Sequence, residues 1–244
     1  MTAINALEGK VTIITGASSG IGAATARALA EAGARTVLVA RRADRLVSLA
    51  AELGEQACVY PADMADPEAA QALHDFTLDR YGQADILVNN AGILHAAPID
   101  SFDLDQLRPM IALNYEAAVR SSTLFGRSMK SAGKGQIINI SSIGANIVAP
   151  GVGVYGGLKR ALEGFTDCLR VELAGTGVKV GIISPGTTST EIFEDMKSRG
   201  QPAWDSFIPP MQPEDVADAV RYMATQPERT NLARIQVFAA CDTH

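Results

Sequence analysis

Hydrophobic positions along the chain gather in seven short runs that are separated by longer segments. The runs occupy residues 11–15, 36–40, 57–61, 85–89, 136–141, 179–184 and 234–239. Apolar residues at consecutive rather than alternating positions are typical of strands that are buried on both faces of a sheet. The segments between the runs are rich in Ala, Leu, Glu and Arg, and they are long enough for crossover helices. The pattern predicts an α/β protein in which helices flank a doubly wound parallel sheet of about seven strands.

The distribution of turn-forming residues indicates one domain over residues 1–244. No linker rich in Pro, Gly or Ser and no internal repeat divides the chain. One irregular stretch covers residues 186–212, where Pro202, Pro209 and Pro210 interrupt a mixture of charged and bulky apolar residues. We expect this stretch to form a lid over a site.

Composition and charge narrow the class of protein. Hydrophobic residues make up 47% of the chain, which is enough for a sizeable core. The formal net charge is -6 and no run of Lys and Arg forms a phosphate-binding stripe, so we expect no nucleic-acid partner. Cys58, Cys168 and Cys241 are isolated, which argues against a disulfide framework and a metal site and fits a cytoplasmic protein. No signal peptide and no apolar run of about 18 residues is found, so no membrane association is expected.

Residues 15–22 have the sequence TGASSGIG and lie between the first predicted strand and an Ala-rich helical segment. Gly16 permits a tight turn, Gly20 lets the backbone approach a pyrophosphate, and Gly22 allows close packing. The N-terminus of the following helix offers N–H groups to anionic oxygens. The pattern predicts a dinucleotide site, and the alternative is that the glycines only close the turn between strand and helix. Further contacts are expected from Ser18, Ser19 and Ile21.

The end of the second predicted strand bears on the choice of dinucleotide. An acidic residue there accepts hydrogen bonds from the adenosine ribose 2′-OH. This chain instead has Ala40, Arg41 and Arg42, and two guanidiniums suit bidentate contact with a 2′-phosphate. We therefore expect NADP(H) to be preferred over NAD(H). The alternative is that both arginines are solvated residues at the start of a helix.

Tyr155 and Lys159 are four residues apart in a segment of helical pattern, and Ser142 lies upstream. Four residues make about one helical turn, so the phenol and the ammonium project from the same face. A free tyrosine has a pKa of about 10 and is a poor acid or base at neutral pH, but a neighbouring cation lowers that pKa. The pair predicts an oxidoreductase site in which Lys159 tunes the phenol.

Taken in chain order, these motifs resemble the short-chain dehydrogenase/reductase family, in its branch of single-domain chains of about 250 residues. The resemblance covers essentially the whole chain. TGASSGIG is similar to the cofactor loop of the family, and PADM, with Asp63 and Met64, is similar to its adenine contact. Its central-strand motif is matched by Asn90, Ala91 and Gly92, and its nicotinamide loop by Pro185, Gly186, Thr188 and Thr190. Its catalytic tetrad is matched by Asn114, Ser142, Tyr155 and Lys159.

The resemblance implies a Rossmann fold, a homotetramer or homodimer, and carbonyl reductase activity that is reversible as alcohol dehydrogenase activity. Tyr155 would give its proton to a carbonyl oxygen as hydride arrives from the nicotinamide. Ser142, rather than Ser141, would hydrogen-bond the same oxygen, and Lys159 would lower the pKa of the phenol and bind the nicotinamide ribose. Asn114 would hold a water in a proton relay, or else only satisfy backbone groups at a helix kink.

Two departures from the family pattern affect packing. The family often has YSASK where this chain has YGGLK, so Gly156 and Gly157 are expected to weaken the start of the helix by up to about 1 kcal/mol each. The last predicted strand lacks the usual Gly-Gly ending, and Thr188 replaces a small apolar residue. We expect the lid and the C-terminal packing to differ most from the family.

The substrate pocket is expected to be mostly apolar. Phe193 in the lid and Val148 ahead of Tyr155 are candidate lining residues, with His95 lining the pocket rather than acting as a second acid. The lid also carries Ile192, Met196, Trp204, Phe207 and Ile208, and its cations are Lys197 and Arg199. An uncharged ketone or aldehyde, or the matching alcohol, is therefore expected. The alternatives are an imine (C=N) reductase, a non-catalytic NADP(H)-sensing protein, and apolar residues that form core or interface instead of a pocket.

Overall fold

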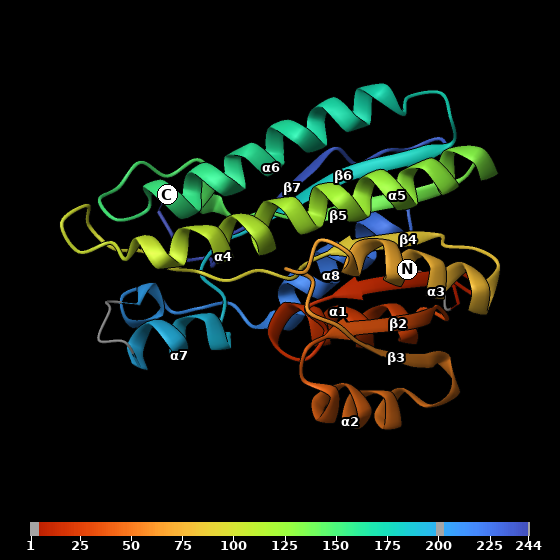
Figure 1. The fold of residues 1–244 in the computed structure, drawn as a ribbon, viewed down its shortest axis with the longest axis horizontal. Helices are drawn as coiled ribbons and strands as arrows, with labels where there is room; N and C mark the ends of the chain where they lie inside the picture. Colours follow the sequence, from red (N-terminus) through yellow and green to blue (C-terminus); the bar gives the residue numbers. More distant parts are fainter. Residues whose placement is uncertain (1–4, 199–202, 244) are drawn as a thin grey trace.

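The computed structural model describes residues 5–198 and 203–243, apart from the side chain of Asp195 (Figure 1). Within these ranges seven strands form one sheet in the order β3-β2-β1-β4-β5-β6-β7, and every neighbouring pair is parallel. The strands are β1 (Val11–Thr15), β2 (Arg35–Ala40), β3 (Ala57–Pro61), β4 (Ile86–Asn89), β5 (Gly135–Ile140), β6 (Val178–Pro185) and β7 (Arg234–Val237). The predicted doubly wound sheet is confirmed.

Helices cover both faces of the sheet (Figure 1). One face packs against α1 (Gly20–Glu31), α2 (Ala43–Leu53) and α8 (Pro213–Ala224), and the other against α3 (Ala69–Tyr81), α5 (Ala117–Ala132) and α6 (Gly153–Glu172). Successive strand residues point to opposite faces, so Ile14 belongs to the first core and Ile13 to the second. Because both faces are covered, the strands need apolar residues at consecutive positions, as the sequence has them.

The chain reverses direction across the sheet between β1 and β4. It builds outward from β1 to the edge strand β3, and returns to place β4 on the other side of β1. Loops that leave the carboxyl ends of two such strands separate, and the crevice between them is the usual ligand site of a doubly wound sheet. The glycine loop follows β1 and residues 90–92 follow β4, so both predicted cofactor segments lie at this crevice.

The predicted lid, residues 186–212, contains α7 (Glu191–Ser198) and a short 3₁₀ turn, Trp204–Ser206. Phe193 and Met196 of α7 are buried in a small apolar cluster that also includes Leu94, Met110 and Tyr155. The segment therefore packs over the start of α6. Arg199 and Pro202, which also belonged to the predicted lid, lie outside the described residues. Within the described ranges, no helix has the length and apolar character that crossing a membrane requires.

Gly156 and Gly157 at the start of α6 have different surroundings. A Cβ atom on Gly156 would lie 2.6 Å from the backbone oxygen of Gly144, whereas one on Gly157 would meet nothing within 4 Å. Gly156 thus allows the turn after β5 to approach α6 closely. For Gly156 the missing side chain also permits this contact, a packing role that the expected weakening of the helix start did not include.

The two glycines give a matched pair of substitutions. We expect Gly156→Ala to lower the free energy of unfolding by roughly 1–3 kcal/mol, because the added methyl group must displace backbone. Gly157→Ala should raise that free energy by up to about 1 kcal/mol, since alanine is the better helix former and has room. Urea denaturation of both variants measures the difference. Equal stabilisation by both substitutions would contradict the packing role of Gly156.

Candidate active site

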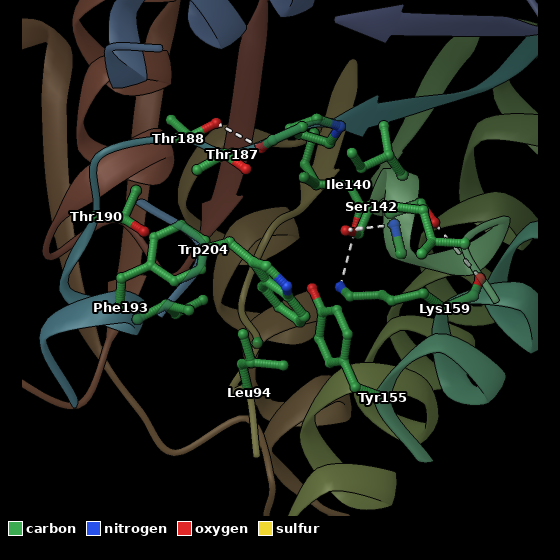
Figure 2. Close-up of a pocket in the computed structure, with 18 of the residues that line it drawn as sticks. Leu94, Ile140, Ser142, Tyr155, Lys159, Thr187, Thr188, Thr190, Phe193 and Trp204 are labelled. Atoms are coloured by element: carbon green, nitrogen blue, oxygen red, sulfur yellow. Dashed lines mark hydrogen bonds between the residues drawn. The ribbon is translucent and has the colours of Figure 1, made fainter. Parts of the chain in front are cut away.

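Tyr155 and Lys159 lie in the first two turns of α6 and point into a cavity at the carboxyl ends of the central strands. Figure 2 shows the phenol oxygen and the amine nitrogen directed toward one another on the same side of this cavity. Ser142, two residues beyond β5, lines the same cavity and precedes a 3₁₀ turn, Ile143–Ala145. Its hydroxyl oxygen accepts a hydrogen bond of 3.0 Å from the Gly144 N–H. The three residues predicted to carry the chemistry are thus brought together.

Burial sets the protonation of the Tyr155 and Lys159 side chains. It raises the pKa of Tyr155 to about 12, although a hydrogen bond with Ser142 acts to lower it. Burial also lowers the pKa of Lys159 to about 8. Both shifts arise because a low-dielectric environment disfavours the charged form of a group. At neutral pH the phenol therefore carries its proton and Lys159 carries its charge.

The expectation that Lys159 brings the pKa of Tyr155 toward neutrality is not met. The Lys159 ammonium donates a hydrogen bond of 3.0 Å to the backbone oxygen of Ile140 and lies 5.8 Å from the centre of the Tyr155 ring. The side chain of Tyr155 is almost fully enclosed, and loss of solvent is the dominant influence on its pKa. The arrangement keeps the phenol a proton donor.

The two serines after β5 have different partners. Ser141 donates a hydrogen bond of 3.0 Å to Oε1 of the buried Glu163, which also accepts one from Ser184. Ser142 has its hydroxyl at the cavity beside Tyr155. This placement fits the hypothesis that Ser142 meets the substrate and Ser141 has a structural role.

Asn114 lies in a π-helical turn, Ala112–Glu116, between α4 (Leu107–Ile111) and α5. Its Nδ2 donates to the backbone oxygens of Ile93 and Met110 at 2.8 and 3.1 Å. Its Oδ1 is buried and has no hydrogen-bond partner among the described residues. The nitrogen satisfies backbone groups, as one of the two predictions held. The water relay stays a prediction, for which the buried Oδ1 offers an acceptor.

A second cavity adjoins the first and runs along the glycine loop to the end of β2. Thirteen of the predicted cofactor contacts line it: Gly16, Ser18, Ser19, Gly20, Ile21, Arg41, Arg42, Asp63, Met64, Asn90, Ala91, Gly92 and Thr190. The predicted contacts Pro185, Gly186 and Thr188 line the first cavity instead, next to Tyr155 and Lys159.

The shape of these two cavities fits an extended dinucleotide. Gly16 and Gly20 have φ of +71° and +51°, backbone conformations that favour glycine. Gly22 lines neither cavity, and a Cβ atom there would lie 2.2 Å from the backbone oxygen of Gly16, so its role is packing, as predicted. Asn90 and Gly92 line both cavities, which therefore adjoin. The residues present fit a nicotinamide dinucleotide, which the glycine loop and the residues along both cavities would hold.

Charged side chains surround the far end of the second cavity, here called the dinucleotide groove, where it passes the end of β2. Arg42 donates hydrogen bonds to the hydroxyls of Ser18 and Ser19 and to Glu191, which also pairs with Arg45. Arg41 is exposed and lies 3.8 Å from Asp63. Sequence analysis did not find Arg45 and Glu191 because they meet only in the fold, 146 residues apart.

The cavity beside Tyr155 is largely apolar. Its wall includes Leu94, Ile147, Ala149, Val152, Ile192, Phe193, Trp204 and Ile208. The rings of Phe193 and Trp204 meet edge to face with centroids 6.2 Å apart, and both side chains pack in the apolar cluster that includes Tyr155. Asp242 of the C-terminal segment also lines this cavity, a contribution that the sequence pattern did not reveal.

Two predicted pocket residues lie elsewhere. Val148 is fully exposed and lines neither cavity, because its neighbours Ile147 and Ala149 take the inward positions. His95 is half-buried and lines neither cavity, since Leu94 directly before it turns inward instead. Phe193 does line the cavity as predicted.

The fold and the site define an oxidoreductase of the Rossmann type, with a dinucleotide groove that leads to a Tyr–Lys–Ser cluster. The family model for short chain dehydrogenases matches residues 10–200, and the chain belongs to this family. The predicted resemblance is therefore confirmed.

Comparison with individual proteins agrees with this assignment. Sulfoacetaldehyde reductase 2 of Chromohalobacter salexigens is 36% identical over 234 residues, which cover 93% of each chain. Glycine betaine reductase of Emericella nidulans is 35% identical over 240 residues, or 95% of this chain, but the match spans 19% of that protein. The closed form of serine dehydrogenase complexed with NADP+ has a TM-score of 0.86 at 27% identity, covering 96% of this chain and 99% of the other.

Proposed function

We propose that the protein is an NADP(H)-dependent oxidoreductase that interconverts an uncharged ketone or aldehyde and the corresponding alcohol. The observation that carries the proposal is the meeting of Ser142, Tyr155 and Lys159 in a cavity that joins the dinucleotide groove. A pure nucleotide sensor has no chemical need for this set.

The nicotinamide, when bound, supplies hydride for reduction or accepts it for oxidation. Tyr155 donates its proton to the carbonyl oxygen, because burial raises its pKa to about 12 and keeps the phenol protonated at neutral pH. Ser142 hydrogen-bonds the same oxygen and fixes its position. Lys159, charged below about pH 8, stabilises the negative charge that develops on the phenol oxygen. Asn114 Oδ1 holds a water through which the proton is replaced.

The preference for NADP(H) over NAD(H) rests on the end of β2. The strand ends at Ala40 with no carboxylate, and Arg41 and Arg42 line the groove directly after it. Guanidiniums bind phosphate in a bidentate manner, and Arg41, which is mostly exposed, is accessible to one. The NADP+ in the serine dehydrogenase structure supports the same preference.

The proposed substrate is largely apolar because the walls of the cavity are. Among the lining residues within the described part of the chain the one cation is Lys159, which already donates to the Ile140 oxygen, so no second cation is present to bind a phosphate or carboxylate substrate. The carboxyl group of Asp242 further disfavours an anion. Sulfoacetaldehyde reductase 2, which matches over 93% of each chain, supports reduction as the direction.

The proposal includes a homotetramer or homodimer in the reducing cytoplasm. Ile111 and Val171 are exposed apolar residues of α4 and α6, which suits a helical interface between subunits. The cytoplasmic location is proposed because Cys58, Cys168 and Cys241 are isolated along the chain. Light scattering should give a mass of two or four times the 25.6 kDa of one chain, and a mass of one chain would contradict this part of the proposal.

The test is a cofactor and substrate panel. Loss of reduced-nicotinamide absorbance is followed with NADPH and, separately, NADH against small ketones, aldehydes and cyclic imines. We expect turnover of a carbonyl compound with higher kcat/KM for NADPH, and a shift toward NADH in the Arg41→Asp variant because the new carboxylate repels the 2′-phosphate. Turnover confined to imines, or an unchanged cofactor ratio in Arg41→Asp, would contradict the corresponding part of the proposal.

A further inference from the structure

The first residue of α7 joins the lid to the far end of the dinucleotide groove. Glu191 Oε2 accepts a hydrogen bond of 2.7 Å from Arg42 Nη1, and its Oε1 accepts one from Arg45. Arg42 also donates through Nε and Nη2 to the hydroxyls of Ser18 and Ser19, at distances of 2.8 to 3.1 Å. Glu191 itself lines the groove beside these residues. The guanidinium of Arg42 therefore already has an anionic partner.

This pairing matters because a guanidinium has a limited set of donors. Arg42 uses Nε, Nη1 and Nη2 in the contacts with Glu191 and the two serines. A 2′-phosphate that approaches the same fork meets a carboxylate on it, and like charges at this distance repel each other. Glu191 and an adenosine 2′-phosphate thus compete for one guanidinium.

Glu191 is ionised at neutral pH. Partial burial acts to raise its pKa, but hydrogen bonds from Arg45 and Arg42 outweigh this and lower the pKa to about 2. The side chain is 47% exposed, so solvent screens the pair and the carboxylate can be displaced. The ionised Glu191 carboxylate and the 2′-phosphate therefore compete for Arg42, and the ion pair that the phosphate must displace is only moderately strong.

The position of Glu191 also connects this competition to the lid. Ile192 and Phe193, the next two residues of α7, line the substrate cavity, and Thr190 lies against the glycine loop at Gly20. A single turn of chain thus contacts the adenosine end of the groove, the glycine loop and the substrate cavity.

We propose that Glu191 is a cofactor-discriminating residue. Its carboxylate competes with the 2′-phosphate of NADP(H) for Arg42 and so reduces the preference for NADP(H) over NAD(H). This inference rests on the proposed function, in which Arg42 contributes to phosphate recognition. It adds a residue that opposes NADP(H) binding and that lies far from the arginines in the sequence, on the predicted lid.

The test uses binding of nucleotide fragments, which needs no turnover. Glu191→Gln keeps the size of the side chain and removes its charge. By isothermal titration calorimetry, we expect this variant to bind adenosine 2′,5′-bisphosphate roughly fivefold more tightly than the wild type, with binding of 5′-AMP changed by less than about twofold. In the Arg42→Ala background the same substitution should have no such effect, because the contested guanidinium is gone.

Glu194→Gln is the matched control. It removes a carboxylate from the same helix, but Glu194 pairs with Lys197 at 3.0 Å rather than with Arg42. An equal gain for both nucleotides in Glu191→Gln, the same gain in Glu194→Gln, or a gain that persists without Arg42 would overturn the inference. If the wild type binds both fragments equally well but Glu191→Gln gains affinity for the bisphosphate alone, the proposed NADP(H) preference fails while the inference stands.

Discussion

Replacement of Tyr155 by Phe should reduce the turnover of a carbonyl substrate by about 10²- to 10⁴-fold, the usual contribution of a positioned proton donor. The substitution removes only the phenol oxygen, and the ring keeps its place in the apolar cluster with Leu94, Met110 and Phe193. Because the donor is lost and the packing is kept, kcat should fall far more than the affinity for NADPH. Steady-state kinetics together with NADPH fluorescence titration separates these two quantities.

The control for this variant is Tyr222→Phe. Tyr222 is an exposed residue of α8 and lines neither cavity, so removal of its hydroxyl should leave turnover unchanged. A Tyr155→Phe protein that retains turnover within about tenfold of the wild type would rule out Tyr155 as the proton donor.

The architecture was predictable because its signals are local. Apolar residues at consecutive positions mark strands covered on both faces, and all seven predicted runs became strands of one parallel sheet. The glycine loop is equally local, since a tight turn between a strand and a helix fixes where its backbone N–H groups point. The spacing between Tyr155 and Lys159 likewise places both side chains on one face of α6.

The parts that escaped prediction depend on side-chain direction or on distant contacts. Nothing in the residue types shows that Val148 points to solvent while Ile147 and Ala149 point inward. The pairing of Arg45 with Glu191 forms only when α7 is folded against the end of the groove. The packing role of Gly156 depends on the backbone oxygen of Gly144, twelve residues earlier. Sequence spacing predicted that Tyr155 and Lys159 meet, but not that burial would outweigh the cation in setting the pKa of the phenol.

The burial of Lys159 carries a cost that function explains. Its pKa is lowered from 10.5 to about 8, which corresponds to roughly 3 kcal/mol of unfavourable burial of the charge. The hydrogen bond to the Ile140 oxygen recovers roughly 1 kcal/mol of this. The protein therefore keeps a destabilising cation at the place where the proposed reaction needs a positive charge beside the phenol.

Lys159→Met is accordingly expected to be more stable and nearly inactive. At pH 7 the free energy of unfolding should rise by about 1–2 kcal/mol, the burial cost less the lost hydrogen bond. Turnover should fall by about 10²-fold or more, because no cation stabilises the developing phenolate. Thermal or urea unfolding and steady-state kinetics measure the two effects on the same variant.

The pH dependence distinguishes this explanation from a simple packing effect. Below about pH 8 Lys159 is charged in both folded and unfolded chains, so the wild type bears the full burial cost. Between about pH 8 and 10.5 the folded protein has lost this proton while the unfolded chain keeps it, so the stability of the wild type rises with pH relative to the variant. The advantage of Lys159→Met should therefore shrink across this window.

Lys179→Met, at the half-buried start of β6, is the control for turnover. It should leave turnover intact, since Lys179 lines neither cavity. A stability gain for Lys159→Met that is constant from pH 7 to 10 would show that desolvation of the charge is not its cause.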